Sequence, residues 1–377
     1  MKRKSLIFIT VLIMASTILT GCGQTKGART EENKSEYSQK NEADKMENNT
    51  GNPNSQITLT SEVIQLDKGL SAVKYEGRYG FEEFLAQGGA SSDAEVAQFL
   101  TRDILFGQNI PSFGSLAFGC STISVKDKDG SALFGRNFDW NACNAMIVQS
   151  VPETGYASIS TVNTDFINMS GFSMAQLPDS VQAIVALYAP LDGMNEKGLA
   201  VSVNMIQDSS GISQNTDKPD ITTTTAIRLL LDKAADTDEA VKLLSGYDMH
   251  ASMGYMMHLA LSDAAGRSVV VEYIDNEMVV TETPVVTNFY LAKGKKNGIG
   301  TAQSHERYDI LMKSLSKKQT MNMDEVRDAL DSVSKDNFGE FESTEWSIVF
   351  NQNTGEVHYY HRENYQDRYV FRIKMED

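Results

Sequence analysis

The sequence predicts an α+β protein in which antiparallel sheets are covered on their outer faces by helices. Three observations lead to this class. Short runs of alternating apolar and polar residues follow one another, helical periodicity occurs in pairs between these runs, and strands and helices do not alternate singly as in a parallel sheet. The 377 residues suffice for one large core or two small ones.

Composition and missing motifs exclude several classes of function. A net charge of −16 and a pI near 4.8 argue against a nucleic-acid partner, because phosphates would be repelled over most of the surface. The sequence has no H-E-x-x-H, no C-x-x-C, no phosphate-binding loop and no G-x-S-x-G, and its five histidines show no metal-ligand spacing. We therefore expect neither a metal nor a cofactor.

The first 21 residues are predicted to be a lipoprotein signal peptide. A basic start at Met1–Lys4 precedes the mostly apolar run Leu6–Leu19, which is short for a membrane-spanning helix and typical of a signal-peptide core. The run ends in Leu19-Thr20-Gly21-Cys22, which resembles the bacterial lipobox. A lipid on Cys22 would anchor the protein at the bacterial cell surface, on the outer side of the cytoplasmic membrane. The alternative is an ordinary secretion signal with a chance cysteine.

The next hundred residues are predicted to be a tether and a prosegment. Residues 22–56 hold almost no aliphatic side chains and cannot bury enough surface to form a fold, so we expect a disordered tether. Residues 57–119 are predicted to be a prosegment packed on the fold, and residues 120–377 to be the catalytic domain. The elements predicted within the prosegment are strands within 57–77, a helix over Phe81–Leu85 and a helix over Ala94–Leu105.

A hairpin opens the catalytic domain. Cys120–Val125 and Ala132–Asn137 alternate as strands, and Asp-Lys-Asp-Gly lies in the turn between them. The remaining elements are predicted in order: strands Ala145–Pro152, Tyr156–Val162 and Val181–Leu187, a turn Asp192–Gly198, strand Leu199–Asn204, helices Thr222–Ala235 and Thr237–Leu244, strands Met256–Ser262, Ser268–Ile274 and Glu277–Glu282, a short strand end Val285–Asn288, helices Gln303–Leu315 and Met323–Ser332, and strands Glu345–Phe350, Glu356–His361 and Arg368–Ile373.

Cys120 is the candidate nucleophile. The chain has three cysteines, so it is not a disulfide scaffold, and we expect Cys120 to be a free thiol and Cys143 to be a packing residue. A cysteine hydrolase usually needs a histidine base, and none is singled out here. An N-terminal cysteine removes that need, because its own α-amine titrates near neutral pH and can take the thiol proton.

Two motifs resemble the choloylglycine hydrolase family of linear amide C-N hydrolases, whose relatives include penicillin V acylases, bile-salt hydrolases and acid ceramidase. They are Gly119–Ile123 and Gly135–Trp140. The resemblance implies an N-terminal-nucleophile hydrolase. The fold that it implies is a four-layer αββα sandwich of two antiparallel sheets with outer helices. It also implies the site residues: Cys120 as nucleophile, Arg136 and Asp139 beside its thiol and amine, Asn204 as oxyanion donor, Asn288 at the amine and substrate carbonyl, and the distal Arg307.

The resemblance further implies that the bond between Gly119 and Cys120 is cut by the protein itself, and that the substrate is a small N-acyl amide. Two alternatives stay open: an acyltransferase on the same site, and a non-catalytic surface lipoprotein that binds a ligand. Two departures from the family pattern are visible. The nineteen residues from Asn288 to Arg307 leave no room for the family's tetramer-building excursion, and the long prosegment is closer to the ceramidase-like branch.

Overall fold

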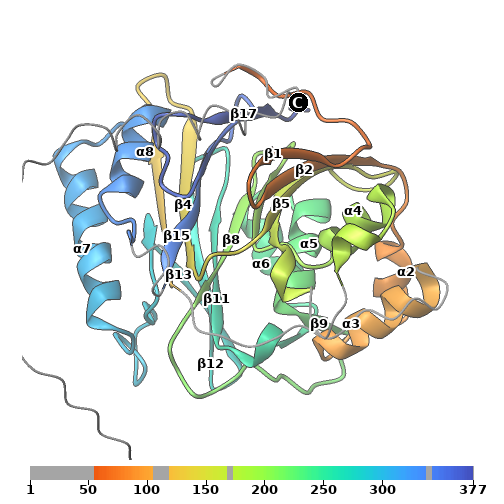
Figure 1. Cartoon of the computed structure of the whole chain (residues 1–377). Coiled ribbons are helices and arrows are strands. Elements are labelled where there is room, and N and C mark those ends of the chain that lie inside the picture. The colour runs from red at the N-terminus through yellow and green to blue at the C-terminus, as the bar shows by residue number, and fades with distance from the viewer. Residues whose placement is uncertain (1–54, 105–118, 168–172, 337–341, 377) are drawn as a thin grey trace, which may run out of the picture. The chain divides into compact units, whose positions relative to one another are not determined.

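The computed structural model describes residues 55–104, 119–167, 173–336 and 342–376 (Figure 1). The predicted signal peptide, the lipid site at Cys22 and almost all of the tether lie outside the described residues, as do residues 105–118 of the prosegment. All described residues belong to one compact unit, Thr50–Asp377. Among their helices, none combines the length and the apolar character that a membrane crossing requires.

A nine-stranded sheet forms one inner layer. In spatial order its strands are β1 (Ile64–Asp67), β2 (Leu70–Glu76), β5 (Ala145–Val151), β6 (Ser158–Asn163), β7 (Asp192–Asn195), β8 (Ala200–Met205), β11 (Met257–Ser262), β12 (Ser268–Ile274) and β13 (Glu277–Glu282). Neighbouring strands are antiparallel, except that β2 runs parallel to β5 over seven residue pairs. The prosegment therefore contributes strands to the main sheet.

A six-stranded antiparallel sheet forms the second inner layer and carries the predicted hairpin. Its order is β14 (Val285–Val286), β3 (Gly119–Lys126), β4 (Ala132–Trp140), β15 (Ser343–Asn351), β16 (Glu356–His361) and β17 (Tyr369–Arg372). All nine residues of β4 are buried, because β4 is covered on both faces. The strand extends beyond the predicted end at Asn137, where Phe138 stacks on Trp346 with ring centroids 3.9 Å apart.

Helices cover the outer face of each sheet, so the predicted four-layer α+β fold is confirmed (Figure 1). On the nine-stranded sheet lie α4 (Asp179–Leu187), α5 (Thr223–Lys233) and α6 (Thr237–Leu244); on the six-stranded sheet lie α7 (Ala302–Lys317) and α8 (Met323–Asp331). The prosegment adds α2 (Phe81–Ala86) and α3 (Asp93–Phe99). Apolar side chains of α7 and α8, including Leu311 and Leu330, pack on Ile123 of β3 and form their own small core.

The smaller elements connect these layers. They are a π-helical turn at Leu100–Ile104, 3₁₀ turns at Thr164–Phe166, Met174–Gln176 and Ser252–Gly254, and a parallel pair of short strands, β9 (Asp220–Thr222) and β10 (Asp248–His250). The helix predicted over Ala94–Leu105 is therefore α-helical only to Phe99.

The strand predicted over Val181–Leu187 is wrong, because this segment is helical and makes up most of α4. A short apolar run is compatible with a buried strand or a buried helix, and periodicity alone does not separate them. Here Pro178 stands at the helix N-cap and the Gln182 side chain donates to the Leu177 carbonyl at 2.9 Å. Packing on β2 and β5 then buries most of the helix surface.

The turn predicted over Asp192–Gly198 is also partly wrong. Asp192–Asn195 form strand β7, which pairs with β6 and β8, and the reversal begins only at Glu196. Position 193 has no space for a side chain. A Cβ added to Gly193 would lie 2.6 Å from the Ile159 carbonyl oxygen and 2.7 Å from a Leu231 methyl carbon. Pairing on both edges outweighs the turn propensity of Asp, Gly and Asn.

Candidate active site

The β3–β4 hairpin places Cys120 and Arg136 in the space between the two sheets. Cys120 is fully buried, and an Arg136 Nη2 lies 3.5 Å from its Sγ. Burial raises the pKa of the Cys120 thiol to about 11, against the opposing effect of the Arg136 guanidinium. In this uncleaved chain the thiol is therefore neutral at pH 7 and shielded from solvent.

Arg136 is fixed from the opposite sheet. It forms a fully buried ion pair with Asp192 of β7 and donates to the Val203 carbonyl of β8 at 2.9 Å. The Trp346 indole donates to the same Asp192 carboxylate at 2.9 Å. Sequence reasoning missed Asp192, because it assigned the residue to a turn. Only a strand predicted over Asp192–Asn195 would have placed this carboxylate between the two sheets.

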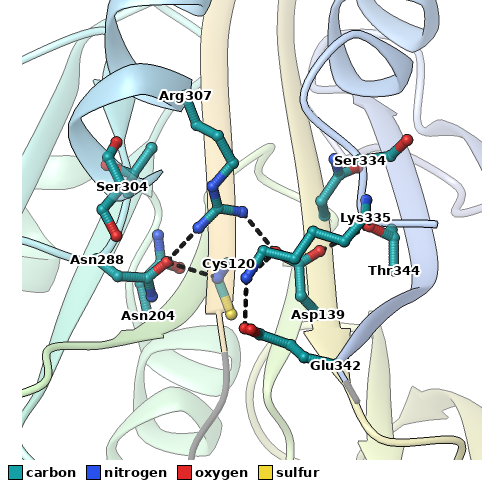
Figure 2. A network of polar contacts seen from close by, with 12 residues as sticks. Cys120, Asp139, Asn204, Asn288, Ser304, Arg307, Ser334, Lys335, Glu342 and Thr344 are labelled. Atoms are coloured by element: carbon teal, nitrogen blue, oxygen red, sulfur yellow. Dashed lines mark hydrogen bonds and ion pairs between the residues drawn. The ribbon is translucent and has the colours of Figure 1, made fainter. Parts of the chain in front are cut away.

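The main-chain nitrogen of Cys120 is held by a side chain rather than by a neighbouring strand. It donates to Asn288 Oδ1 at 2.8 Å, and Arg307 Nη2 donates to the same oxygen at 2.6 Å (Figure 2). Asn288 Nδ2 donates to the Met205 carbonyl at 2.7 Å, which fixes the orientation of the amide. The structure thus brings Asn288 into contact with Cys120, and Arg307 into contact with Asn288.

Asp139 lies on the other side of Arg307. Its carboxylate forms a buried ion pair with Arg307 and accepts a hydrogen bond from Thr344 Oγ1 at 2.7 Å (Figure 2). Arg307 therefore bridges Asp139 and Asn288 with its two terminal nitrogens. Its helix, α7, starts with the Thr301 side chain accepting from the Ser304 N–H, a regular N-cap that fixes where the helix and its arginine begin.

Asn204 lies on β8, which packs against β3 across the two sheets. Ser202 Oγ donates to Asn204 Oδ1 at 2.9 Å, and Asn204 Nδ2 points to the Val286 carbonyl at 3.4 Å. Val286 is two residues before Asn288, so both asparagines border the same strand end. The Ser202 bond turns the Asn204 NH₂ group toward the site, where a hydrogen-bond donor for an oxyanion is required.

A buried lysine completes the cluster and was not found from the sequence. Lys335, 6% exposed, lies 2.5 Å from Glu342 Oε1 and 3.9 Å from Asp139 Oδ2 through its Nζ (Figure 2). The Lys335 ammonium and the Glu342 carboxylate both lie next to the α-carbon of Gly119. A Cβ added there would lie 2.5 Å from Glu342 Oε1, 2.6 Å from Lys335 Nζ and 3.0 Å from Asp139 Oδ2. Lys335 follows helix α8 with no motif around it, so the sequence carried no signal.

A buried His258–Glu272 pair supports the strand end that carries Asn288. His258 lies opposite Asn204 in the β8–β11 pairing, and its Nε2 lies 2.7 Å from the Thr287 carbonyl oxygen. Its Nδ1 lies 3.1 Å from Glu272, whose carboxylate also accepts the main-chain N–H groups of residues 291 and 292. Burial opposes ionisation of Glu272, but the hydrogen bond from His258 lowers its pKa overall.

Cys143 is the second described cysteine, and it is bonded neither to Cys120 nor to any other cysteine. It is buried, and its main-chain N–H donates to Glu345 at 3.0 Å. Burial raises the pKa of its thiol well above the usual range. Cys143 is part of the hydrophobic core, in agreement with the packing role expected for it.

Comparison with known proteins shows a similarity to one family over part of the chain. Residues 120–290 match the model of the linear amide C-N hydrolases, choloylglycine hydrolase family. The penicillin V acylase of Pectobacterium atrosepticum is 34% identical over 103 residues, which are 24% of this chain and 26% of that relative. The chain thus matches about a quarter of the length of this curated relative.

Solved structures show the same fold. Two variants of the conjugated bile acid hydrolase from Clostridium perfringens superpose with a TM-score of 0.51 each, at 18% and 16% identity, over 68% of this chain and 93% and 94% of theirs. At this identity the likeness concerns the fold alone. Over residues 120–290 the chain is thus similar to the choloylglycine hydrolase family of linear amide C-N hydrolases, the family that its motifs resemble.

Proposed function

We propose that the chain is a lipid-anchored amidase that hydrolyses a linear, non-peptide C–N bond of a small N-acyl substrate, with the Cys120 thiol as nucleophile. In this proposal the chain first cuts itself between Gly119 and Cys120. One observation carries it: a single buried cluster receives both reactive groups of Cys120, the thiol at Arg136 and the main-chain nitrogen at Asn288. A cysteine with a purely packing role does not need its nitrogen bound by a side chain.

The geometry supports the following sequence of steps. After cleavage, the new α-amine stays near Asn288 Oδ1 and takes the proton of the thiol. The thiolate, favoured by the Arg136 charge once solvent enters, attacks the amide carbonyl. The Asn204 amide and a main-chain N–H stabilise the oxyanion. The ammonium then protonates the leaving nitrogen, and the amine activates the water that hydrolyses the acyl-enzyme.

Cleavage before turnover is a requirement of this mechanism. In the uncleaved chain Cys120 is 0% exposed, so a substrate cannot contact the thiol. The family match that starts at Cys120 also supports a new N-terminus at this residue.

The test combines intact mass with a substrate panel. We expect the purified wild type to contain a chain that begins at Cys120 and to hydrolyse at least one of penicillin V, conjugated bile acids, N-acyl amino acids or N-acyl homoserine lactones. Cys120→Ala should remain in one piece and be inactive, whereas Cys143→Ala should behave as wild type. A cleaved Cys120→Ala variant would contradict the scheme.

The same experiment separates the two alternative functions. Acyl transfer to an added amine would identify an acyltransferase instead, and an uncleaved wild type that binds panel compounds would favour a binding protein.

A lipid on Cys22 would anchor the fragment that holds the tether and the prosegment. After cleavage the catalytic part must therefore stay at the membrane without a covalent bond to this fragment. Several contacts support retention. Strand β2 pairs with β5 along its whole length, and Phe84 is fully buried against Phe99 and Tyr188. We expect membranes washed with salt or mild urea to keep the chain that begins at Cys120. Its release by such a wash would contradict retention.

A further inference from the structure

Beyond the residues that the family resemblance implies, the pair Lys335–Glu342 lies beside the α-carbon of Gly119, the residue before the proposed cleavage site. The positions occupied by Lys335 Nζ and Glu342 Oε1 leave space at residue 119 only for a hydrogen atom, because an added Cβ would lie 2.6 and 2.5 Å from them. The α-carbon of Gly119 is one covalent bond from the carbonyl carbon that Cys120 must attack. No other ammonium group of the described lysines is this deeply buried.

We propose that Lys335 is a processing residue, which stabilises the negative charge on the Gly119 carbonyl oxygen during self-cleavage. This inference rests on the proposed function, since it assigns a residue to its first step. Glu342 and Asp139 would hold the ammonium in place and compensate its charge before the reaction. An ammonium has three N–H groups, so it can keep its bond to Glu342 and still donate to a new oxyanion.

The cationic groups already assigned to the site are committed elsewhere. The two terminal nitrogens of Arg307 bind Asp139 and Asn288, and those of Arg136 bind Asp192 and the Val203 carbonyl. Both arginines are thereby fixed in orientation. Lys335 enters the cluster from the side opposite Asn288 (Figure 2). Because its stem is flexible, its ammonium can follow the carbonyl as it becomes tetrahedral.

The chemical step balances as follows. Cys120 Sγ gives up its proton and forms a bond to the Gly119 carbonyl carbon, and the C=O π pair moves to oxygen beside the Lys335 ammonium. Collapse of this intermediate breaks the C–N bond, and the nitrogen of Cys120 takes up the proton. The resulting thioester is hydrolysed by water to the Gly119 carboxylate and the free thiol. Lys335 remains protonated throughout.

The experiment follows cleavage of the full-length chain after pulse-labelled cell-free synthesis, with intact mass as the readout. Lys335→Met should slow cleavage about 100-fold, the size of effect seen when one oxyanion donor is removed. Hydroxylamine, which cleaves thioesters, should not restore cleavage, because the missing charge acts before the thioester forms. Lys233→Met is the matched control: it removes the ion pair between Lys233 of α5 and Glu82 of α2 and should be cleaved at the wild-type rate.

Lys335→Gln is a second variant in case Lys335→Met does not fold, because the glutamine amide can still donate to Glu342. Melting curves measured by circular dichroism show which variant is folded, and cleavage is measured on that variant. Lys335 variants that fold and are cleaved at the wild-type rate would overturn this inference alone. So would rescue by hydroxylamine, which places the defect after thioester formation. A wild-type chain that stays intact overturns the proposed function and this inference with it.

Discussion

The main-chain nitrogen of Cys120 donates to the side-chain oxygen of Asn288, 168 residues away, at 2.8 Å. Arg307 donates to the same oxygen and reaches Asp139 with its other terminal nitrogen. The nucleophile, the amide that holds its nitrogen and two charged residues therefore form one connected network between the sheets. Changes to any member are expected to act on the position of Cys120 as well as on their own partner.

Asn288→Leu removes the acceptor for Cys120 and Arg307 while it keeps the branched shape of the side chain. We expect kcat for the N-acyl amide that the panel identifies to fall about 100-fold, because the amine and the thiol lose their fixed orientation. Initial rates and intact mass measure turnover and cleavage separately. Asn364→Leu, on a surface turn, is the control, and unchanged kcat in Asn288→Leu would contradict the network.

Asp192→Asn tests the buried ion pair with Arg136. The variant leaves the guanidinium uncompensated in a fully buried position, so the free energy of unfolding should fall by about 3–5 kcal/mol. Urea unfolding measures it. Asp324→Asn removes a partly exposed pair with Arg368 and should change the free energy by less than about 1 kcal/mol. Equal effects of the two substitutions would count against a structural role for Asp192.

Gly119→Ala places a methyl group on the Lys335–Glu342 pair. The atoms that it meets are the ends of flexible side chains, so the protein should still fold, but with the pair displaced. We expect cleavage to slow at least about tenfold, as part of the stabilisation of the oxyanion is lost. Gly211→Ala, whose Cβ meets nothing within 4 Å, serves as the control. Cleavage as fast as in the wild type would show that contact with Gly119 is unimportant.

The pH dependence of cleavage follows from the thiol. Burial raises the pKa of Cys120 to about 11, and the thiolate is the nucleophile. Below that pKa the thiolate fraction grows about tenfold per pH unit, so the rate of self-cleavage should rise from pH 7 to 9 with a slope near one on a logarithmic scale. Pulse-labelled chains chased at each pH measure the rate, with circular dichroism as the control for folding. A flat profile would mean that thiol ionisation does not limit cleavage.

Local pattern was sufficient for most elements. Strands β12, β13 and β16 and helix α6 have the predicted bounds, because alternation, turn residues and the Asp236 N-cap are all encoded within a few residues. Val181–Leu187 and Asp192–Asn195 were assigned wrongly for the opposite reason. The first segment is apolar except for Gln182, and the second holds turn-forming residues, so their structure depends on the strands that they pack against.

By itself the sequence determined the α+β class and the hairpin that presents Cys120. Through the family motifs it also predicted the candidate site residues Arg136, Asp139, Asn204, Asn288 and Arg307. Only the tertiary structure decided which charges pair: Arg136 with Asp192, Asp139 with Arg307, and Lys335 with Glu342 at Gly119. The reason is physical. The two residues of each pair come from different elements or from the segments beside them. Sheet register and burial bring the two charges together, and no local pattern of residues specifies either.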